Sequence, residues 1–145
     1  MTQDDQATLL YLVKQVELAV RARLDGVVAA EGLTTIQYTA LTVLERHPDL
    51  TSAALARHSF VRAQTMGELV AALDARGLIE RHPDPRSRRQ NLIRLTADGR
   101  RVLEALREPV AQLEQRMTAQ TSASRVATAR AALEAWRDAL SAPDD

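Results

Sequence analysis

The stretch GLIERHPDPRSRRQNLIRLTADGRR, residues 77–101, decides the fold of this chain. Two short apolar strands, 78–81 and 91–95, are predicted on either side of a connection whose proline, aspartate and serine residues favour a turn. Only Asp84 is an acid close to the three arginines of this connection, which are Arg86, Arg88 and Arg89. A β-hairpin of this composition is typical of the wing of a DNA-binding domain.

The charge of the chain is concentrated in the same region. The 145 residues include 19 basic and 19 acidic ones, and a net charge of zero argues against a general binder of polyanions. The segment from Arg76 to Arg101, however, holds eight arginines and three acids, so it carries +5 and the remainder −5. A local positive field of this kind predicts a polyanionic partner at the hairpin, such as double-stranded DNA.

Composition excludes several other classes of protein. The chain has no cysteine, and its three histidines lack the spacing of a metal site, so we expect neither a metal nor a cofactor. No nucleophile elbow, phosphate loop or pair of catalytic acids is present, which argues against an enzyme. The start, MTQDDQ, does not resemble a leader, and no apolar run approaches the length of a membrane span. We therefore expect a cytoplasmic protein with no membrane partner.

Apolar residues at spacings of three and four predict a long amphipathic helix over 5–32. Thr34 and Gln37 form the pattern of a capping box that opens a second helix. Thr51 is expected to cap a short helix, 52–58. Because the first helix is long for a small domain, it is expected to pair with a second copy of the chain.

A fourth helix is expected over 62–76, with Gly77 as the left-handed residue after its end. Together with the short helix before it, this predicts a helix-turn-helix whose second helix reads DNA. After the hairpin, Thr96 is expected to cap a fifth helix, and either Ser122 or Ser124 opens the last one.

The predicted fold is mainly α: a winged helix-turn-helix with a two-stranded β-wing and long N- and C-terminal dimerisation helices. The chain, 1–145, is expected to be a single domain, with the DNA-binding lobe at 34–96 and dimerisation helices at 5–32 and 97–141. A symmetric homodimer would present two recognition helices and two wings, and would select an inverted repeat.

Three motifs make the sequence similar to a known family. They are LDARGLIER at 73–81, DPRSRR at 84–89 and LTADG at 95–99, and the likeness in motif covers about residues 51–100. Together they resemble the MarR family of bacterial transcriptional regulators. The resemblance implies a homodimer, most often a repressor, that binds a pseudopalindromic operator and is released by a small, often phenolic or lipophilic, ligand. In this family the ligand commonly lies between the dimerisation helices and the DNA-binding lobe.

The resemblance also assigns a role to the wing. Arg89 stands where the family places the arginine that enters the minor groove, and its alternative is a solvated arginine on a loop. Arg86 and Arg88 are expected to contact phosphate or shape the wing. Many relatives carry an acidic residue at the position of Ser87, and that acid can orient the arginine at the tip of the wing. Its absence leaves open which of the three arginines enters the groove.

The recognition helix has candidate base contacts on its exposed side. Gln64 could read adenine and Thr65 a thymine methyl or phosphate, whereas Glu68 either accepts from cytosine or is a solvated surface acid. The predicted DNA-binding residues of this helix are Arg62, Ala63, Gln64, Thr65 and Glu68. Because the helix is poor in basic residues, the wing is expected to carry much of the affinity.

Two alternatives concern the ligand and the partner. Tyr11 and Tyr38 either pack in the core or dimer interface, or line the ligand pocket implied by the resemblance. The rival function is a winged-helix module that binds protein rather than DNA. Its distinguishing feature would be a hairpin whose arginines are covered by acids of the same chain.

Overall fold

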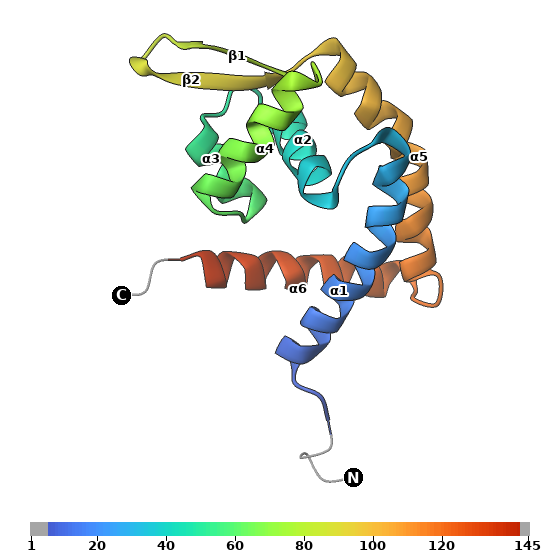
Figure 1. Cartoon of the computed structure of the whole chain (residues 1–145). Helices are drawn as coiled ribbons and strands as arrows, with labels where there is room; N and C mark the ends of the chain where they lie inside the picture. Colours follow the sequence, from blue (N-terminus) through green and yellow to red (C-terminus); the bar gives the residue numbers. More distant parts are fainter. Residues whose placement is uncertain (1–5, 143–145) are drawn as a thin grey trace. The chain divides into compact units, whose positions relative to one another are not determined.

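The computed structural model describes residues 6–142, and the chain divides into two compact units, residues up to Val110 and from Ala111 onward. Figure 1 labels the elements: α1 (Leu9–Val28), the 3-10 turn η2 (Ala29–Glu31), α2 (Thr35–Arg46), α3 (Ser52–Ser59), α4 (Ala63–Ala75), β1 (Ile79–Asp84), β2 (Ser87–Leu95), α5 (Ala97–Thr118) and α6 (Ala123–Ser141). This order confirms the mainly helical fold with a two-stranded antiparallel wing. The expectation of a single domain stays a prediction.

The helices begin where the sequence places capping residues. Thr34 and Gln37 form the predicted capping box at the start of α2, with both side-chain to backbone bonds present. The first helix starts at Leu9, capped by Thr8, whereas residue 5, its expected start, lies outside the described residues. It ends in η2 and then Gly32, whose φ of 70° is left-handed. The predicted end near Gly32 is confirmed.

The helix-turn-helix is formed by α3 and α4. Thr51 Oγ1 accepts from the Ala54 backbone N–H at 3.2 Å and so caps α3 as predicted. Arg62 lies at the N-cap of α4 rather than inside the helix, and Gly77 follows its end with φ 72°. Buried apolar side chains of both helices join one core with α2, the hairpin and the first half of α5.

The hairpin is longer than the sequence predicts. Its strands pair from Ile79 and Leu95 out to Asp84 and Ser87, with a bulge next to Pro83, so the predicted 78–81 and 91–95 are too short. Proline in this position favours a turn, but a two-stranded ribbon accepts it because the outer edge of the ribbon needs no N–H. The turn itself is stabilised by Asp84, whose Oδ1 accepts from the Arg86 backbone N–H at 2.9 Å.

The wing is joined to the rest of the first unit at its root. The backbone of Leu50, just before α3, pairs with Ile93 of β2 through two hydrogen bonds of 3.2 and 2.7 Å. Thr96 caps α5 through a bond from the Gly99 N–H to its hydroxyl, as predicted. Gly99 is buried against Leu78, the residue that precedes β1.

The second unit contains the end of α5 and the last helix. Ser122 caps α6, accepting from the Arg125 N–H at 3.3 Å, so it rather than Ser124 is the N-cap. Leu133, Trp136 and Leu140 of α6 are exposed. In the described part of the chain, no single helix is long and apolar enough to cross a membrane, and one bent pair, Leu9–Glu31 with Thr35–Arg46, meets the criteria of length and composition.

Candidate nucleic-acid interface

The recognition helix α4 presents a polar first turn and hides its apolar side. Met66, Leu69, Val70 and Leu73 are buried in the core. The predicted contact residues are all exposed: Arg62, Ala63, Gln64, Thr65 and Glu68. Arg62 precedes the helix, and α4 itself contains two acids and no basic residue. Its surface can therefore supply hydrogen bonds to bases but little attraction for phosphate.

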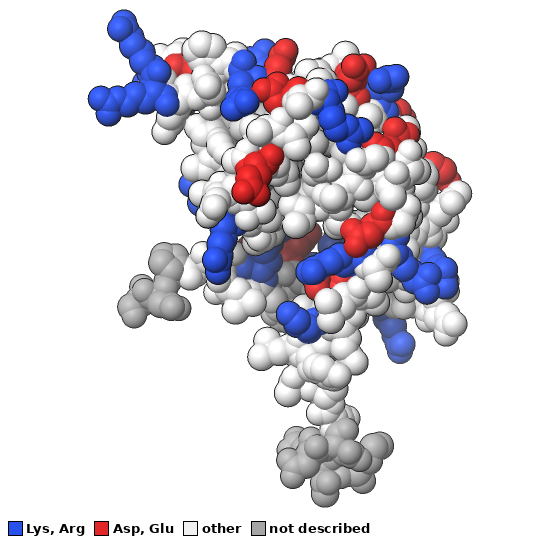
Figure 2. Space-filling view, in the orientation of Figure 1, with Lys and Arg blue, Asp and Glu red and all other residues white. Residues whose placement is uncertain are grey.

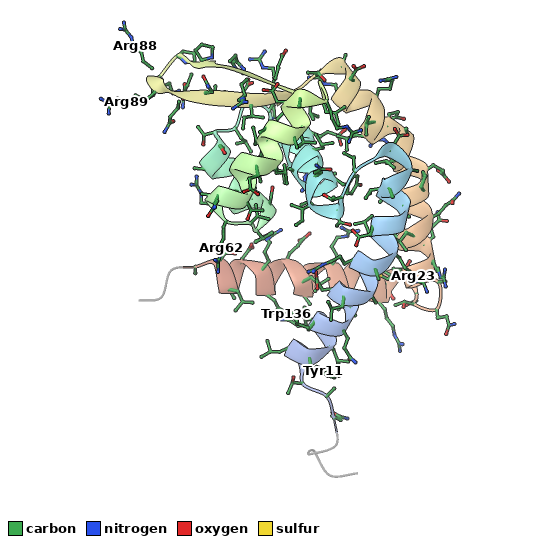
Figure 3. The ribbon with its side chains drawn as sticks, viewed as in Figure 1. Tyr11, Arg23, Arg62, Arg88, Arg89 and Trp136 are labelled. Carbon is green, nitrogen blue, oxygen red and sulfur yellow. The ribbon has the colours of Figure 1, made fainter. Side chains whose placement is uncertain are left out.

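The tip of the wing supplies that positive charge. Arg86, Arg88 and Arg89 are exposed, and among the described residues none of them forms an ion pair. Figure 2 shows basic side chains projecting at the far end of the hairpin, and Figure 3 shows Arg88 and Arg89 pointing outward from it. Asp84, the only acid in the connection, bonds to backbone at the turn. Free guanidinium groups are thus held out from the lobe, in the form that phosphate or groove binding requires.

Arginines at the root of the wing are bound differently. Arg81 donates to Asp74 Oδ2 from both Nε (3.2 Å) and Nη2 (2.9 Å). Arg94 Nε lies 3.0 Å from Asp49 Oδ1. The acids of this chain therefore neutralise the root of the hairpin and leave its tip unpaired, which is not the pattern expected of a wing masked by its own chain.

A groove of about 310 Å³ separates the recognition helix from the wing. Its lining includes Arg89 together with residues that sequence reasoning did not single out: Ser52, Gly67, Arg81, Gln90 and Asn91. Gln90 and Asn91 follow Arg89 directly along β2, so polar residues next to the predicted arginine were the signal that could have found them. Ser52 comes to the groove through the Leu50–Ile93 pairing, which no local pattern reveals.

A second, larger pocket lies between α1, α2 and the turn before α4. Its volume is about 660 Å³, and its lining combines apolar side chains such as Leu33, Ile36 and Phe60 with polar groups. The Thr35 hydroxyl donates to Asp25, and Arg21 pairs with Glu17 along α1. The Ser59 hydroxyl is buried and has no hydrogen-bond partner among the described residues. A concave site with a few convergent polar groups is typical of small-molecule binding.

The two tyrosines named from the sequence lie elsewhere. Tyr11 is exposed on the first half of α1, and neither it nor Tyr38 lines the 660 Å³ pocket. Tyr38 packs against the core. Burial, and then the nearby Glu45 carboxylate, raise the pKa of the Tyr38 phenol, which keeps it neutral. Within residues 6–142, no cluster of three or more histidine or acidic side chains could hold a metal ion.

Comparison with known proteins agrees with this geometry. A family model described as MarR family matches residues 31–90. The HTH-type transcriptional repressor Rv2887 of Mycobacterium tuberculosis is 31% identical over 119 residues, which cover 82% of this chain and 86% of that protein. The chain belongs to the MarR family of winged-helix transcriptional regulators.

Solved MarR-type structures share the fold. A mutant MarR from E. coli complexed with operator DNA is 25% identical, with a TM-score of 0.78 over 87% of this chain and 91% of that one. The PcaV regulator from Streptomyces coelicolor, in complex with its natural ligand, is 27% identical, with a TM-score of 0.77 over 97% and 99%. MarR-family proteins are regulators rather than enzymes, which confirms the expectation that this chain has no catalytic activity.

Proposed function

We propose that this MarR-family regulator is a repressor that binds a pseudopalindromic operator as a homodimer and is released by a small molecule. The observation that carries the DNA-binding part is the wing: exposed arginines at its tip are free of acids, whereas those at its root are paired. The rival protein-binding module would cover its own tip arginines. The M. tuberculosis relative, which is named a repressor, supports the sign of regulation.

In this proposal the two parts of the surface have different tasks. Gln64 and Thr65, in the first turn of α4, meet base edges in the major groove, and Arg62 contacts phosphate. Arg89 enters the minor groove, while Arg86 and Arg88 contact the backbone beside it. Glu68 sits on the same exposed helix face and either accepts from a cytosine or remains solvated.

Binding to DNA is tested with the intergenic DNA upstream of the gene. Arg89→Ala is expected to weaken binding by roughly 1–3 kcal/mol if this arginine enters the groove. Arg101→Ala is the matched control, because it removes the same charge from an exposed residue that is paired with Asp98. Affinity should also fall steeply as salt rises. An isotherm unchanged by Arg89→Ala would remove this residue from the groove, and no gel shift at low salt would favour the protein-binding module.

Pairing of two chains is supported by the exposed apolar residues of α1. Its first half exposes Leu9, Leu10, Tyr11, Leu12, Val13, Val16 and Leu18. An exposed apolar surface of this length on a single helix is stabilised when a second copy covers it. Sedimentation equilibrium should therefore report twice the chain mass, and a monomer at micromolar concentration would contradict the homodimer.

Release by a ligand is supported by the 660 Å³ pocket, whose size and mixed lining suit a small aromatic or lipophilic molecule. A ligand that prefers one spacing of the two DNA-reading lobes shifts the balance between a binding and a non-binding state. Simple phenols should raise the melting temperature and release DNA, and Ile36→Trp, which fills the pocket, should abolish both effects. Thermal shifts that survive Ile36→Trp would place the ligand elsewhere. We further propose that the protein acts in the cytoplasm, where its DNA lies.

A further inference from the structure

Asp49, in the turn between α2 and α3, adopts a backbone conformation that favours glycine. Its φ is 64°, and among the described residues only Phe60 is another non-glycine residue with positive φ. A β-carbon in the left-handed region costs energy, although aspartate tolerates it better than most residues. Such an outlier calls for an account of what the side chain does there.

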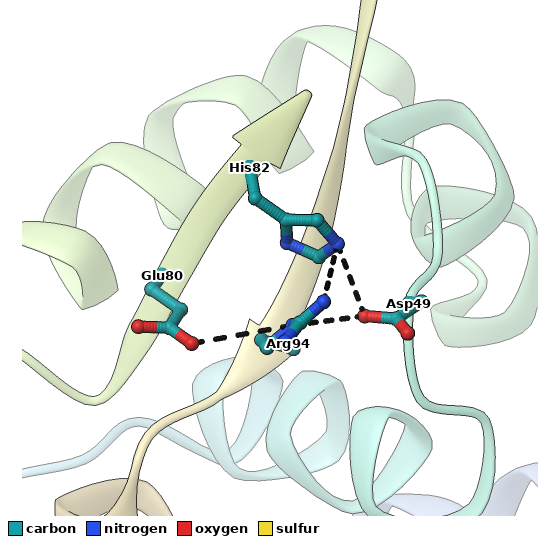
Figure 4. Close-up of polar contacts among 4 residues, drawn as sticks. All are labelled: Asp49, Glu80, His82 and Arg94. Atoms are coloured by element: carbon teal, nitrogen blue, oxygen red, sulfur yellow. Dashed lines mark hydrogen bonds and ion pairs between the residues drawn. The ribbon is translucent and has the colours of Figure 1, made fainter. Parts of the chain in front are cut away.

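The carboxylate of Asp49 contacts both strands of the wing. Its Oδ1 lies 3.0 Å from Arg94 Nε on β2 and 3.4 Å from His82 Nε2 on β1. Arg94 Nη2 in turn lies 2.6 Å from His82 Nε2, and Arg94 Nε is 4.0 Å from Glu80 Oε1. Figure 4 shows the four side chains converging, with Asp49 coming from a separate segment. One carboxylate thereby ties the hairpin to the turn before α3.

The contact lies at the root of the hairpin, where a small change of angle moves the tip by a larger distance. Leu50, the next residue, pairs with Ile93 through backbone bonds that join the hairpin to the lobe along one line. The hairpin can tilt about this line, and the Asp49–Arg94 contact beside it opposes the tilt together with the Arg81–Asp74 pair on α4. Arg89 lies five residues beyond Arg94, or about 16 Å along an extended strand, so a rotation of about 10° at the root moves the tip by about 3 Å.

We propose that Asp49 is a positioning residue for the wing: by holding Arg94, which also donates to His82, it sets the angle of the hairpin and so the place of the tip arginines relative to α4. The inference rests on the proposed function, in which the tip contacts DNA. It explains why an acid occupies a backbone position that suits glycine. The wing is aimed by a residue outside the hairpin itself.

Two substitutions separate an effect on the orientation of the wing from an effect on the stability of the fold. Asp49→Gly removes the carboxylate and also relieves the left-handed backbone, so the variant should unfold in urea no more easily than the parent. Asp49→Asn removes only the charge. Both should bind operator DNA about two- to fivefold more weakly, the range of a partly exposed ion pair. Asp98→Asn, which breaks the exposed Asp98–Arg101 pair outside the wing, is the matched control and should bind as the parent does.

Two further readouts decide the inference. Hydrogen exchange of the hairpin amides, measured without DNA, should quicken in both Asp49 variants and not in Asp98→Asn; unchanged exchange would overturn the inference by itself. In a mutant cycle, Asp49→Gly should cost little affinity once Arg86, Arg88 and Arg89 are all alanine, because Asp49 acts through these three side chains. Losses that simply multiply would also overturn it. If Arg89→Ala alone leaves binding intact while exchange quickens, the proposed DNA contact fails and the anchoring of the wing stands.

Discussion

The root and the tip of the hairpin use arginine in opposite ways. At the root, Arg81 and Arg94 are bound by Asp74 and Asp49, which come from α4 and from the turn before α3. At the tip, the arginines extend beyond the lobe, and in the described chain no acid forms an ion pair with them. The acids that could mask the wing are used instead where the wing meets the lobe.

This difference shows how a chain of zero net charge can present a site for a polyanion. An arginine paired with a carboxylate must give up that contact before it binds phosphate, whereas an unpaired, solvated one loses only water and counterions. Net charge is therefore a poor guide to this surface. What matters is where the acids of the same chain lie.

The largest effect on DNA binding is expected from removing the arginines at the tip of the wing. Replacing Arg86, Arg88 and Arg89 together by alanine should weaken operator binding roughly a hundredfold or more, and lower the slope of log affinity against log salt by up to about 2.7. Stability in urea should not change, because these side chains make no ion pair within residues 6–142.

The control for that variant removes three arginines that are paired. Arg101, Arg107 and Arg137 lie outside the hairpin, each within 4.0 Å of an acid, and replacing all three changes the formal charge by the same amount. Fluorescence anisotropy at several salt concentrations compares the two triple variants. Equal losses of affinity would mean that total charge, and not the unpaired tip, governs binding.

A second prediction concerns the close packing of Gly99, in α5, against the backbone at the root of the hairpin. A β-carbon at Gly99 would lie 2.2 Å from the Leu78 carbonyl oxygen, which already accepts from the Thr96 N–H. Gly99→Ala should therefore lower the free energy of unfolding by roughly 1–3 kcal/mol through overpacking. Urea titration followed by circular dichroism measures the change.

The contrasting variant is Gly67→Ala, in the middle of α4. A β-carbon there meets nothing within 4 Å, so the variant should be about 0.5–1 kcal/mol more stable than the parent. If both glycines respond alike, the close approach at Leu78 is not what fixes the root.

The sequence predicted the features whose causes are local. Caps at Thr34, Thr51 and Thr96 depend on bonds that span three residues, and the structure confirms them. The left-handed Gly77 after α4 is equally local. The arginine-rich connection also stands in the sequence, and the structure places it at an exposed turn, although its contacts with DNA remain a prediction.

The root could not be predicted in this way. Asp49 and Arg94 are 45 residues apart, and only the Leu50–Ile93 pairing brings them together. The longer strands depend on pairing across the hairpin, such as Pro83 with Asn91, which overrides the turn preference of Pro83. Likewise, the unpartnered Ser59 hydroxyl marks the larger pocket only after α1 and α2 are placed against α3.

The smallest effect tests whether an acid at the root masks an arginine. Asp74→Asn breaks a half-exposed pair, so it should cost only about 0.2–1 kcal/mol of stability, and less at high salt. It also frees Arg81, which lines the groove between α4 and the wing. Arg81 would then be unpaired, like the arginines at the tip, and free to bind phosphate. The slope of log affinity against log salt should steepen by up to about 0.9.

The direction of the change in affinity distinguishes the two root acids. If Asp74 masks Arg81, operator binding by Asp74→Asn should be as tight as that of the parent or tighter, measured by anisotropy at low salt. Asp49→Asn removes the same charge from the other root pair. This variant is expected to bind more weakly, because the angle of the hairpin is no longer fixed by the Asp49–Arg94 pair. Weaker binding by both variants would mean that both acids position the hairpin. Neither Arg81 nor Arg94 would then be an arginine that its acid merely keeps from binding DNA.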